Sequence, residues 1–524
     1  MSEFFLELFS EEIPTNLQKN SRKNLLQNFK DFFRKKDISF NKEISFSTPN
    51  RLLILFDSIK PEISQKEKEI RGPKIDAPEK ALNGFLRSNN LENKDLYKKE
   101  NEKGVFYFAK KPAKTIKVFD LLNENIPLIL DKILWKKSMK WGDFELYWAR
   151  PLKSILAIFN NKNLIFKYYH LQSSNFTIID KDFEDRTKTF KNFKLYIDYF
   201  KKSKIIIDQN QRKKFIETKL LKISNKKNLL IEINEKLLDE VTNLVNKPNI
   251  ILCKFDEKFL KIPKEVLITT MQFHQKYFHT FDKKRNITNN FLVVANNKDN
   301  KGFIKIGNER VVNARLSDAQ FFWEKDKSNN LVKQVSKLKS MNYFKGLGTY
   351  FDKVQRMRRL GGMISDELLI SKDKVEISNT ICKVDLLSDI VGEFPELQGI
   401  MGGYFAEFQG FDKDISLAVR EHYLPIGTDS KTPKKPFSIA LALTDKIDTL
   451  VGFFGINQKP TSSKDPFALR RSALGVTRLL LENNKEFKLK DLINYSYNLY
   501  LEQGFELSNK AIYKDLNNFF KNLY

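Results

Sequence analysis

A helix that is apolar on two opposite sides is the feature that most constrains the fold of this chain. Residues 441–454 read LALTDKIDTLVGFF, and one helical stripe of this segment is apolar throughout: Leu443, Ile447, Leu450 and Phe454. Leu441 shares the opposite side with Asp445 and Asp448. The pattern predicts a helix packed on both sides. Its carboxylates then need cationic or hydrogen-bonding partners, because burying an unpaired charge is costly.

The nearest cations in the sequence follow a connection rich in Gly, Pro and Ser. Asp465 can cap the next helix, Pro466 can occupy its first position, and three cations gather there: Lys464, Arg470 and Arg471. Positive charge is unfavourable at a helix start, so these cations require an anionic partner. Two partners remain open. The two aspartates could form a structural ion-pair network with them, or a nucleic-acid phosphate could bind there.

Composition limits the class of protein without fixing it. The net charge of +27 suggests a polyanionic partner, although the lysines are spread along the chain and an AT-rich genome would also favour them. No apolar run approaches the roughly 18–20 residues that span a bilayer, and the N-terminus is too acidic for a secretory signal. Cys253 and Cys382 form no disulfide framework and no metal-binding pair. We therefore expect a soluble, cytoplasmic protein without membrane contact.

The chain shows no motif of a self-sufficient active site. His422 falls on the apolar stripe of its helix with Ile415, Ala418 and Val419, which is typical of a packed core histidine. The sequence contains no HExxH, no Cys/His pairing, no phosphate-binding glycine loop and no GxSxG. We predict no catalytic residue and no metal site in this chain.

Periodicity predicts an α+β fold. Strand patterns (51–56, 104–111, 291–297) mix with helices in a body over 1–335, which could hold two lobes at about 1–165 and 166–335. Helical patterns dominate afterwards. One of them, 308–326, has its apolar stripe at Val312, Leu316, Ala319 and Trp323. The predicted domains are a mixed α/β body followed by an all-helical domain over 336–524.

Several long segments resemble, in order, the β subunit of bacterial heterotetrameric glycyl-tRNA synthetase. They include FLELFSEEIP (5–14), STPNRLLI (47–54), MKWGDFELYWARPLKSILAIF (139–159), FLKIPKEVLITTMQFHQKYF (259–278), KIGNERVVNARLSDAQFFWEKD (305–326), VGEFPELQGIMGGYFA (391–406) and SSKDPFALRRSALGVTRLLLE (462–482). Together they extend over nearly the whole chain. Several long motifs in register are far more specific than any short pattern.

The resemblance implies a non-catalytic partner subunit. A separate α subunit would carry the class II site and use ATP and Mg²⁺, with no cofactor bound by this chain. The β subunit would bind tRNA(Gly) and position it within an α2β2 assembly. The resemblance also implies that the helical domain is similar to HD-type phosphohydrolases, which explains the aspartates near 445.

Three departures from the family pattern concern possible RNA contacts. The chain ends at Tyr524, where family members usually continue into an anticodon-binding domain, so we expect that domain to be absent. The family's twin arginine is Asn50-Arg51 here. The family's His-Arg-Phe is His170-Leu171-Gln172, which predicts a lost contact.

Cations are the candidate residues for contacts with tRNA or with the α subunit. We place Lys464, Arg470 and Arg471 first, followed by Arg310, Arg315, Arg356, Arg359, Arg51 and Arg150. Two alternatives remain. One is a metal-dependent HD-type phosphohydrolase using His422, Asp445 and Asp448, and the other is a general RNA-binding protein.

Overall fold

The computed structural model describes residues 2–65, 68–89, 91–101, 104–111, 114–180, 186–461 and 464–523. Ser462, Ser463 and Tyr524, which carry expectations above, lie outside these ranges. The chain divides into two compact units, Met1–Leu252 with Leu292–Ile304, and Cys253–Phe291 with Lys305–Tyr524. The predicted limit between 335 and 336 falls inside the second unit, and a separate domain from 336 stays a prediction, as does the division at 165.

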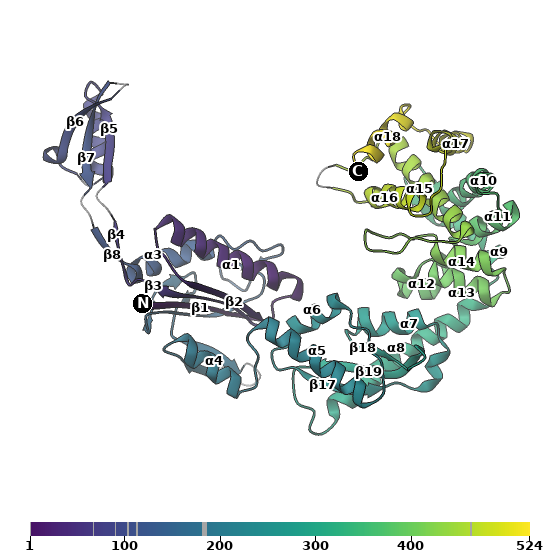
Figure 1. Cartoon of the computed structure of the whole chain (residues 1–524), viewed down its shortest axis with the longest axis horizontal. Coiled ribbons are helices and arrows are strands. Elements are labelled where there is room, and N and C mark those ends of the chain that lie inside the picture. The colour runs from purple at the N-terminus through teal and green to yellow at the C-terminus, as the bar shows by residue number, and fades with distance from the viewer. Residues whose placement is uncertain are drawn as a thin grey trace. The chain divides into compact units, whose positions relative to one another are not determined.

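An antiparallel sheet forms the core of the first unit, in the order β12–β11–β1–β3–β2. Its strands are β1 (Ser2–Ser10), β2 (Lys42–Thr48), β3 (Arg51–Ile59), β11 (Leu152–Phe159) and β12 (Lys162–Asn163). Side chains alternate along a strand, so Phe4 and Phe5 of β1 enter different cores. One face packs against α1 (Thr15–Lys35) and α3 (Val118–Leu130), and the other against α4 (Phe193–Lys202) (Figure 1).

Smaller elements complete the first unit. A three-stranded sheet in the order β5–β7–β6 carries α2, and β4 pairs with β8. Their bounds are β4 (Glu62–Gln65), β5 (Lys68–Lys74), α2 (Glu79–Asn89), β6 (Leu96–Asn101), β7 (Gly104–Lys111) and β8 (Lys114–Lys117). Three hairpins follow, β9 (Met139–Lys140) with β10 (Tyr147–Trp148), β13 (Lys167–Tyr168) with β14 (Leu171–Gln172), and β15 (Phe176–Asp180) with β16 (Arg186–Thr189). The helices α5 (Gln209–Lys226) and α6 (Glu235–Leu244) come next.

Another small sheet has the order β17 (Asn249–Lys254), β19 (Ile287–Ala295), β18 (Phe278–Phe281), and the limits of the two units fall within its strands. Beyond it the described chain is helical except for one pair, β20 (Asn342–Phe344) with β21 (Gly348–Thr349). The α+β fold class is therefore confirmed.

The second unit contains a series of helices, and several of them pack around α15. The helices are α7 (Lys264–Thr269), α8 (Phe303–Lys327), α9 (Leu331–Gln334), α10 (Tyr350–Leu368), α11 (Lys372–Ile381), α12 (Asp389–Glu393), α13 (Ile400–Phe408), α14 (Lys413–Glu421), α15 (Pro436–Gly455), α16 (Leu469–Leu481), α17 (Leu489–Glu502) and α18 (Ile512–Lys521). Helices α10, α11, α14, α16, α17 and α18 all contact α15. Both stripes of α15 are buried, as the sequence predicts, and so are the four predicted stripe residues of α8.

Candidate nucleic-acid interface

The two aspartates of α15 lie in a buried ion-pair network. Asp448 accepts hydrogen bonds from Arg356 Nε at 2.7 Å and from Lys353 Nζ at 3.0 Å. Asp445 pairs with the same Lys353 at 3.1 Å and with Lys383 at 3.0 Å. Burial alone would raise the pKa of Asp448, but Arg356 and Lys353 outweigh it and hold that pKa below its ordinary value. The network therefore keeps both carboxylates ionised inside the helical core.

The cations in this network are not the ones nearest in sequence. Arg470 instead donates through Nη2 to the Thr461 carbonyl at 2.6 Å, and Arg471 is exposed. The prediction that Pro466 opens the helix is wrong, because α16 begins at Leu469. Asp465 still stabilises this start, since its carboxylate accepts the backbone N–H groups of Leu469 at 2.8 Å and Arg470 at 3.0 Å. The cations around α16 are therefore not bound by Asp445 and Asp448.

His422 lies beside this network and is fully buried. Its Nε2 is 3.0 Å from Lys383 Nζ, and Lys383 also pairs with Asp445. Burial and then the Lys383 charge hold the pKa of His422 well below its ordinary value, so the ring is neutral. A lysine ammonium thus lies between the histidine and the aspartate that a hydrolase would use for metal. The described residues contain no group of three or more His, Cys, Asp or Glu side chains able to hold a metal ion.

Two of the predicted surface arginines are buried, which corrects their assignment. Arg356 is 1% exposed and bound to Asp448, while Arg51 is 3% exposed and pairs with Glu7 at 3.2 Å. A guanidinium enclosed in this way has no access to an RNA phosphate. Both residues stabilise the cores of their units, so we remove them from the direct-contact candidates.

The other predicted cations lie at the surface in separate places. On α8, Arg310 is exposed and Arg315 pairs with Glu393 at 3.5 Å. Arg150 of the first unit is exposed and lines a cavity of about 610 Å³ together with Glu11 and Glu12. Lys464, which precedes α16, is exposed. The structure thus does not join the predicted cations into one site.

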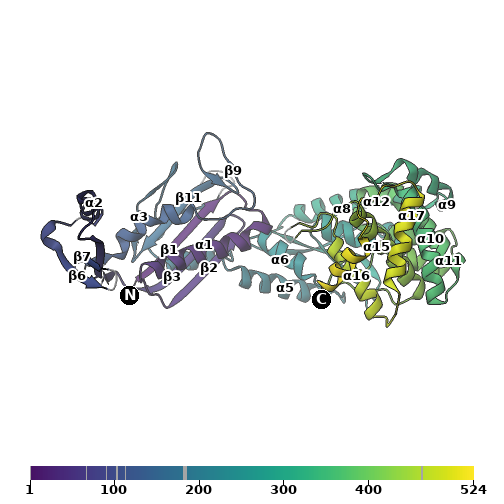
Figure 2. The ribbon, with the colours of Figure 1, turned by 90° about the horizontal axis from the view of Figure 1, so that it is seen from above.

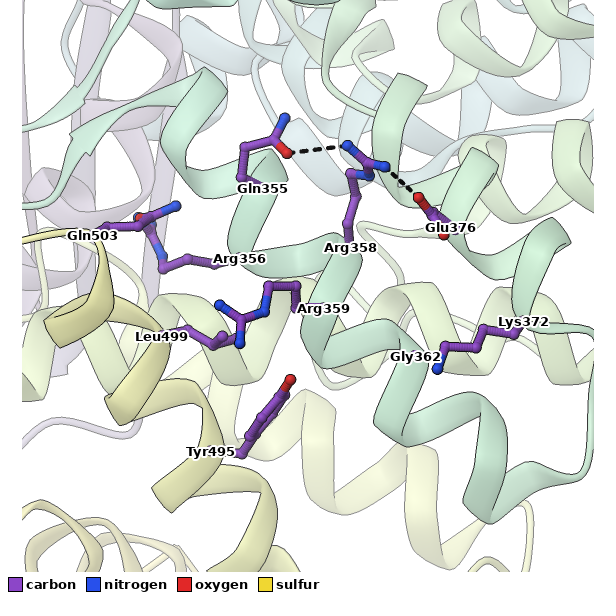
Figure 3. A pocket seen from close by; sticks show the side chains of 10 residues that line it. All are labelled: Gln355, Arg356, Arg358, Arg359, Gly362, Lys372, Glu376, Tyr495, Leu499 and Gln503. Atoms are coloured by element: carbon purple, nitrogen blue, oxygen red, sulfur yellow. Dashed lines mark hydrogen bonds and ion pairs between the residues drawn. The ribbon is translucent and has the colours of Figure 1, made fainter.

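A basic pocket of about 450 Å³ lies among α10, α11 and α17 (Figure 3). Its lining residues are Gln355, Arg356, Arg358, Arg359, Gly362, Lys372, Glu376, Tyr495, Leu499 and Gln503. Arg356 is buried against Asp448, so the cations that face the pocket are Arg358, Arg359 and Lys372, and Glu376 is the one carboxylate among the lining residues. We call this site the basic pocket.

Neighbouring side chains hold the arginines of the basic pocket in place. Arg358 donates to Gln355 Oε1 at 3.0 Å and binds Glu376 (Figure 3). Arg359 binds Glu502, and this hydrogen bond raises the pKa of its guanidinium. Lys372 is the first residue of α11, where the helix dipole also favours an anion. Two arginines held by neighbouring side chains and Lys372 therefore line the pocket where a negatively charged group could bind.

Sequence reasoning missed Arg358 and Lys372 as members of this pocket. The run QRMRR at 355–359 carries three arginines within four positions and could have indicated Arg358. Lys372 carries no such local signal, because only the packing of α11 against α10 brings it to the pocket.

The described helices include none that is long and apolar enough to cross a membrane. A family model described as "Glycyl-tRNA synthetase beta subunit" matches residues 4–523. A glycine–tRNA ligase beta subunit of Rickettsia peacockii (strain Rustic) is 38% identical over 513 residues, covering 98% of this chain and 76% of the relative. The corresponding subunit of Rickettsia africae (strain ESF-5) is 38% identical over 528 residues, covering 100% and 79%.

These matches and the α+β fold define a subunit of an aminoacyl-tRNA synthetase. The chain belongs to the glycyl-tRNA synthetase beta subunit family, whose members are subunits of glycine–tRNA ligase.

Proposed function

We propose that this chain binds tRNA(Gly) and positions it for glycylation at the active site of a separate α subunit. The two chains would act in the cytoplasm as an α2β2 assembly, with ATP and Mg²⁺ used by the α subunit. Family membership supports an α-subunit partner, and the net charge of +27 supports a polyanionic one. The role of the chain is then to raise the effective concentration and fix the orientation of the tRNA.

The basic pocket is the observation that carries this proposal. Its volume of about 450 Å³ admits a phosphate group, and its cations outnumber its single carboxylate. Arginine binds phosphate through a planar fork of donors, and Arg358 and Arg359 are already oriented by Glu376 and Glu502. Phosphate contacts fix the register of an RNA without reading its sequence. Such a pocket therefore suits a subunit that positions tRNA rather than reacting with it.

Direct binding tests the proposal. Labelled tRNA(Gly) is titrated with the purified chain over a range of salt concentrations. We expect log Kd to rise linearly with log salt, because each neutralised phosphate releases counterions. Binding that is absent or independent of salt would contradict the proposal.

The double variant Arg470→Ala with Arg471→Ala tests the start of α16. We expect tRNA binding to weaken about three- to tenfold, with a smaller dependence on salt, because the exposed Arg471 and the partly exposed Arg470 are removed. Neither arginine pairs with Asp445 or Asp448, so the melting temperature should not change. A variant that melts early while its folded fraction binds tRNA normally would show that these arginines are structural.

A further inference from the structure

A short β-ribbon of the first unit exposes aromatic rings at its surface. The ribbon is formed by β9 and β10, which are joined by the loop 141–146 (β9 is labelled in Figure 2). Phe144 is 47% exposed and Tyr147 is 59% exposed. The turn between β13 and β14 adds Tyr169, 44% exposed, and His170, which stacks on Phe144 with ring centroids 3.7 Å apart. We call these four rings the aromatic platform.

The two hairpins that carry the platform also contribute side chains to a buried aromatic core. Trp148 is 2% exposed and packs against Trp135 and Tyr168, with ring centroids 5.0 and 6.4 Å away. Trp141 donates through Nε1 to the Trp148 carbonyl at 3.1 Å. Leu146 and Trp148 point inward, so the intervening Tyr147 points outward, as strand alternation requires. Phe144 stacks on His170, and Tyr169 packs against the buried Tyr168, so these rings have fixed neighbours.

Exposed cations occur in the same chain segments as the platform. The exposed ones are Lys136, Lys137, Lys140, Arg150 and Lys167. Lys140 pairs with Glu145 at 2.6 Å and lies 5.6 Å from the centre of the Tyr147 ring. Within 136–150 the exposed carboxylates are Asp143 and Glu145, so cations are in excess in this segment, while Arg150 also lines a cavity with Glu11 and Glu12. The partner should accordingly be an anion with flat apolar groups.

Unpaired nucleotides have this chemistry, because their bases stack on aromatic rings while their phosphates bind cations. A protein partner fits less well, since the centres of protein interfaces are depleted in lysine. We infer that the aromatic platform binds unpaired nucleotides of RNA by stacking, with phosphate contacts from the lysines of the same segments. This inference rests on the proposed function, because the RNA would be a single-stranded part of the same tRNA.

The test replaces rings by leucine, which keeps apolar volume but removes stacking. The variant Phe144→Leu with Tyr147→Leu is compared with Tyr147→Phe, which retains the ring. Fluorescence anisotropy measures binding of three probes: a short single-stranded RNA, a duplex RNA of equal length, and tRNA(Gly) with or without its unpaired 3′ nucleotides.

For the leucine variant we expect the affinity for the single-stranded RNA to fall about tenfold or more, and the affinity for the duplex to fall less than threefold. The salt dependence of binding should not change. Tyr147→Phe should bind like the parent chain. If the 3′ end is the bound segment, tRNA without it should bind the parent chain more weakly and be insensitive to the leucine changes. Sensitivity that persists without the 3′ end would place the contact in a tRNA loop, which also supports stacking.

Equal losses on single strand and duplex, or no loss on either, would overturn the inference. So would weaker binding of the α subunit by the leucine variant with RNA binding intact, because the platform would then be a protein interface. The two proposals fail separately. If the parent chain binds no tRNA, the proposed function fails, whereas salt-dependent tRNA binding without any effect of the leucine changes defeats the stacking inference alone.

Discussion

Replacing Asp448 with asparagine is expected to lower the free energy of unfolding of the second unit by about 3–5 kcal/mol. The carboxylate is fully buried and accepts hydrogen bonds from Arg356 and Lys353. An asparagine of the same shape leaves these two cations in the core with less negative charge to oppose them. The loss should be far greater than for an exposed ion pair, where water screens both partners.

This loss of stability is measured by urea unfolding, with hydrogen exchange of the backbone amides in α10 and α15 as the probe. Glu502→Gln is the matched control, because it removes one carboxylate from an exposed pair with Arg359. We expect the control to unfold at the parent's urea concentration. An Asp448→Asn protein that is as stable as its parent would show that the buried pairs contribute nothing to this unit.

The pH dependence of the Asp448 effect has a defined sign. The pKa of Asp448 is lowered in the folded protein from an ordinary value of 3.8. The ionised carboxylate therefore stabilises the fold fully above that ordinary pKa, and this contribution is lost as pH falls through the lower folded pKa. The difference between parent and Asp448→Asn should be constant from pH 7 to about pH 5 and should shrink in stronger acid.

Removing cations from the basic pocket is expected to have a large effect on tRNA binding. Replacing both Arg359 and Lys372 by alanine should weaken binding of tRNA(Gly) by about 10- to 100-fold near physiological salt, because both line the basic pocket. The slope of log Kd against log salt should fall by about one to two, since each lost cation reduces counterion release. The same titration that tests direct binding measures both quantities.

Lys510→Ala with Lys514→Ala provides the control for net charge. Both lysines are exposed in the second unit and lie outside the lining of the basic pocket. This control also removes two positive charges, and we expect it to weaken tRNA binding less than threefold. If the two double variants lose equal affinity, the pocket has no special role and the overall charge alone holds the tRNA.

Local periodicity was sufficient to predict which helix faces are buried, but not which charged side chains form ion pairs. The stripes of α15 and α8 are buried as expected, because apolar spacing at 3.6 residues per turn depends on the segment alone. The partners of Asp448 lie in α10, more than ninety residues earlier in the chain. Such long-range pairs leave no trace in spacing, so the arginines nearest in sequence, offered as one possible set of partners, are not the cations that bind Asp448.

The prediction that Arg356 lies at the surface is wrong for a related reason. The helical pattern at 350–364 has an apolar stripe of Val354, Met357, Gly361 and Ile364. Lys353, Arg356 and Arg359 lie off that stripe, which predicts a solvent-exposed face for them. Helix α10 instead contacts α15 and α17 as well as α11, so part of that face is covered. Lys353 and Arg356 are therefore buried against α15, while Arg359 remains exposed at the basic pocket. A charge that partners a buried carboxylate cannot be distinguished from a surface charge by periodicity.

Glycine loading onto tRNA(Gly) tests whether this chain holds the RNA for chemistry that the α subunit performs. The assay compares the α subunit alone, this chain alone and their mixture, each with ATP and Mg²⁺. We expect loading only in the mixture, with loss of loading in the Arg359→Ala and Lys372→Ala double variant at limiting tRNA. Loading by the α subunit alone at the rate of the mixture, or by this chain alone, would show that this chain does not hold the tRNA for the α subunit.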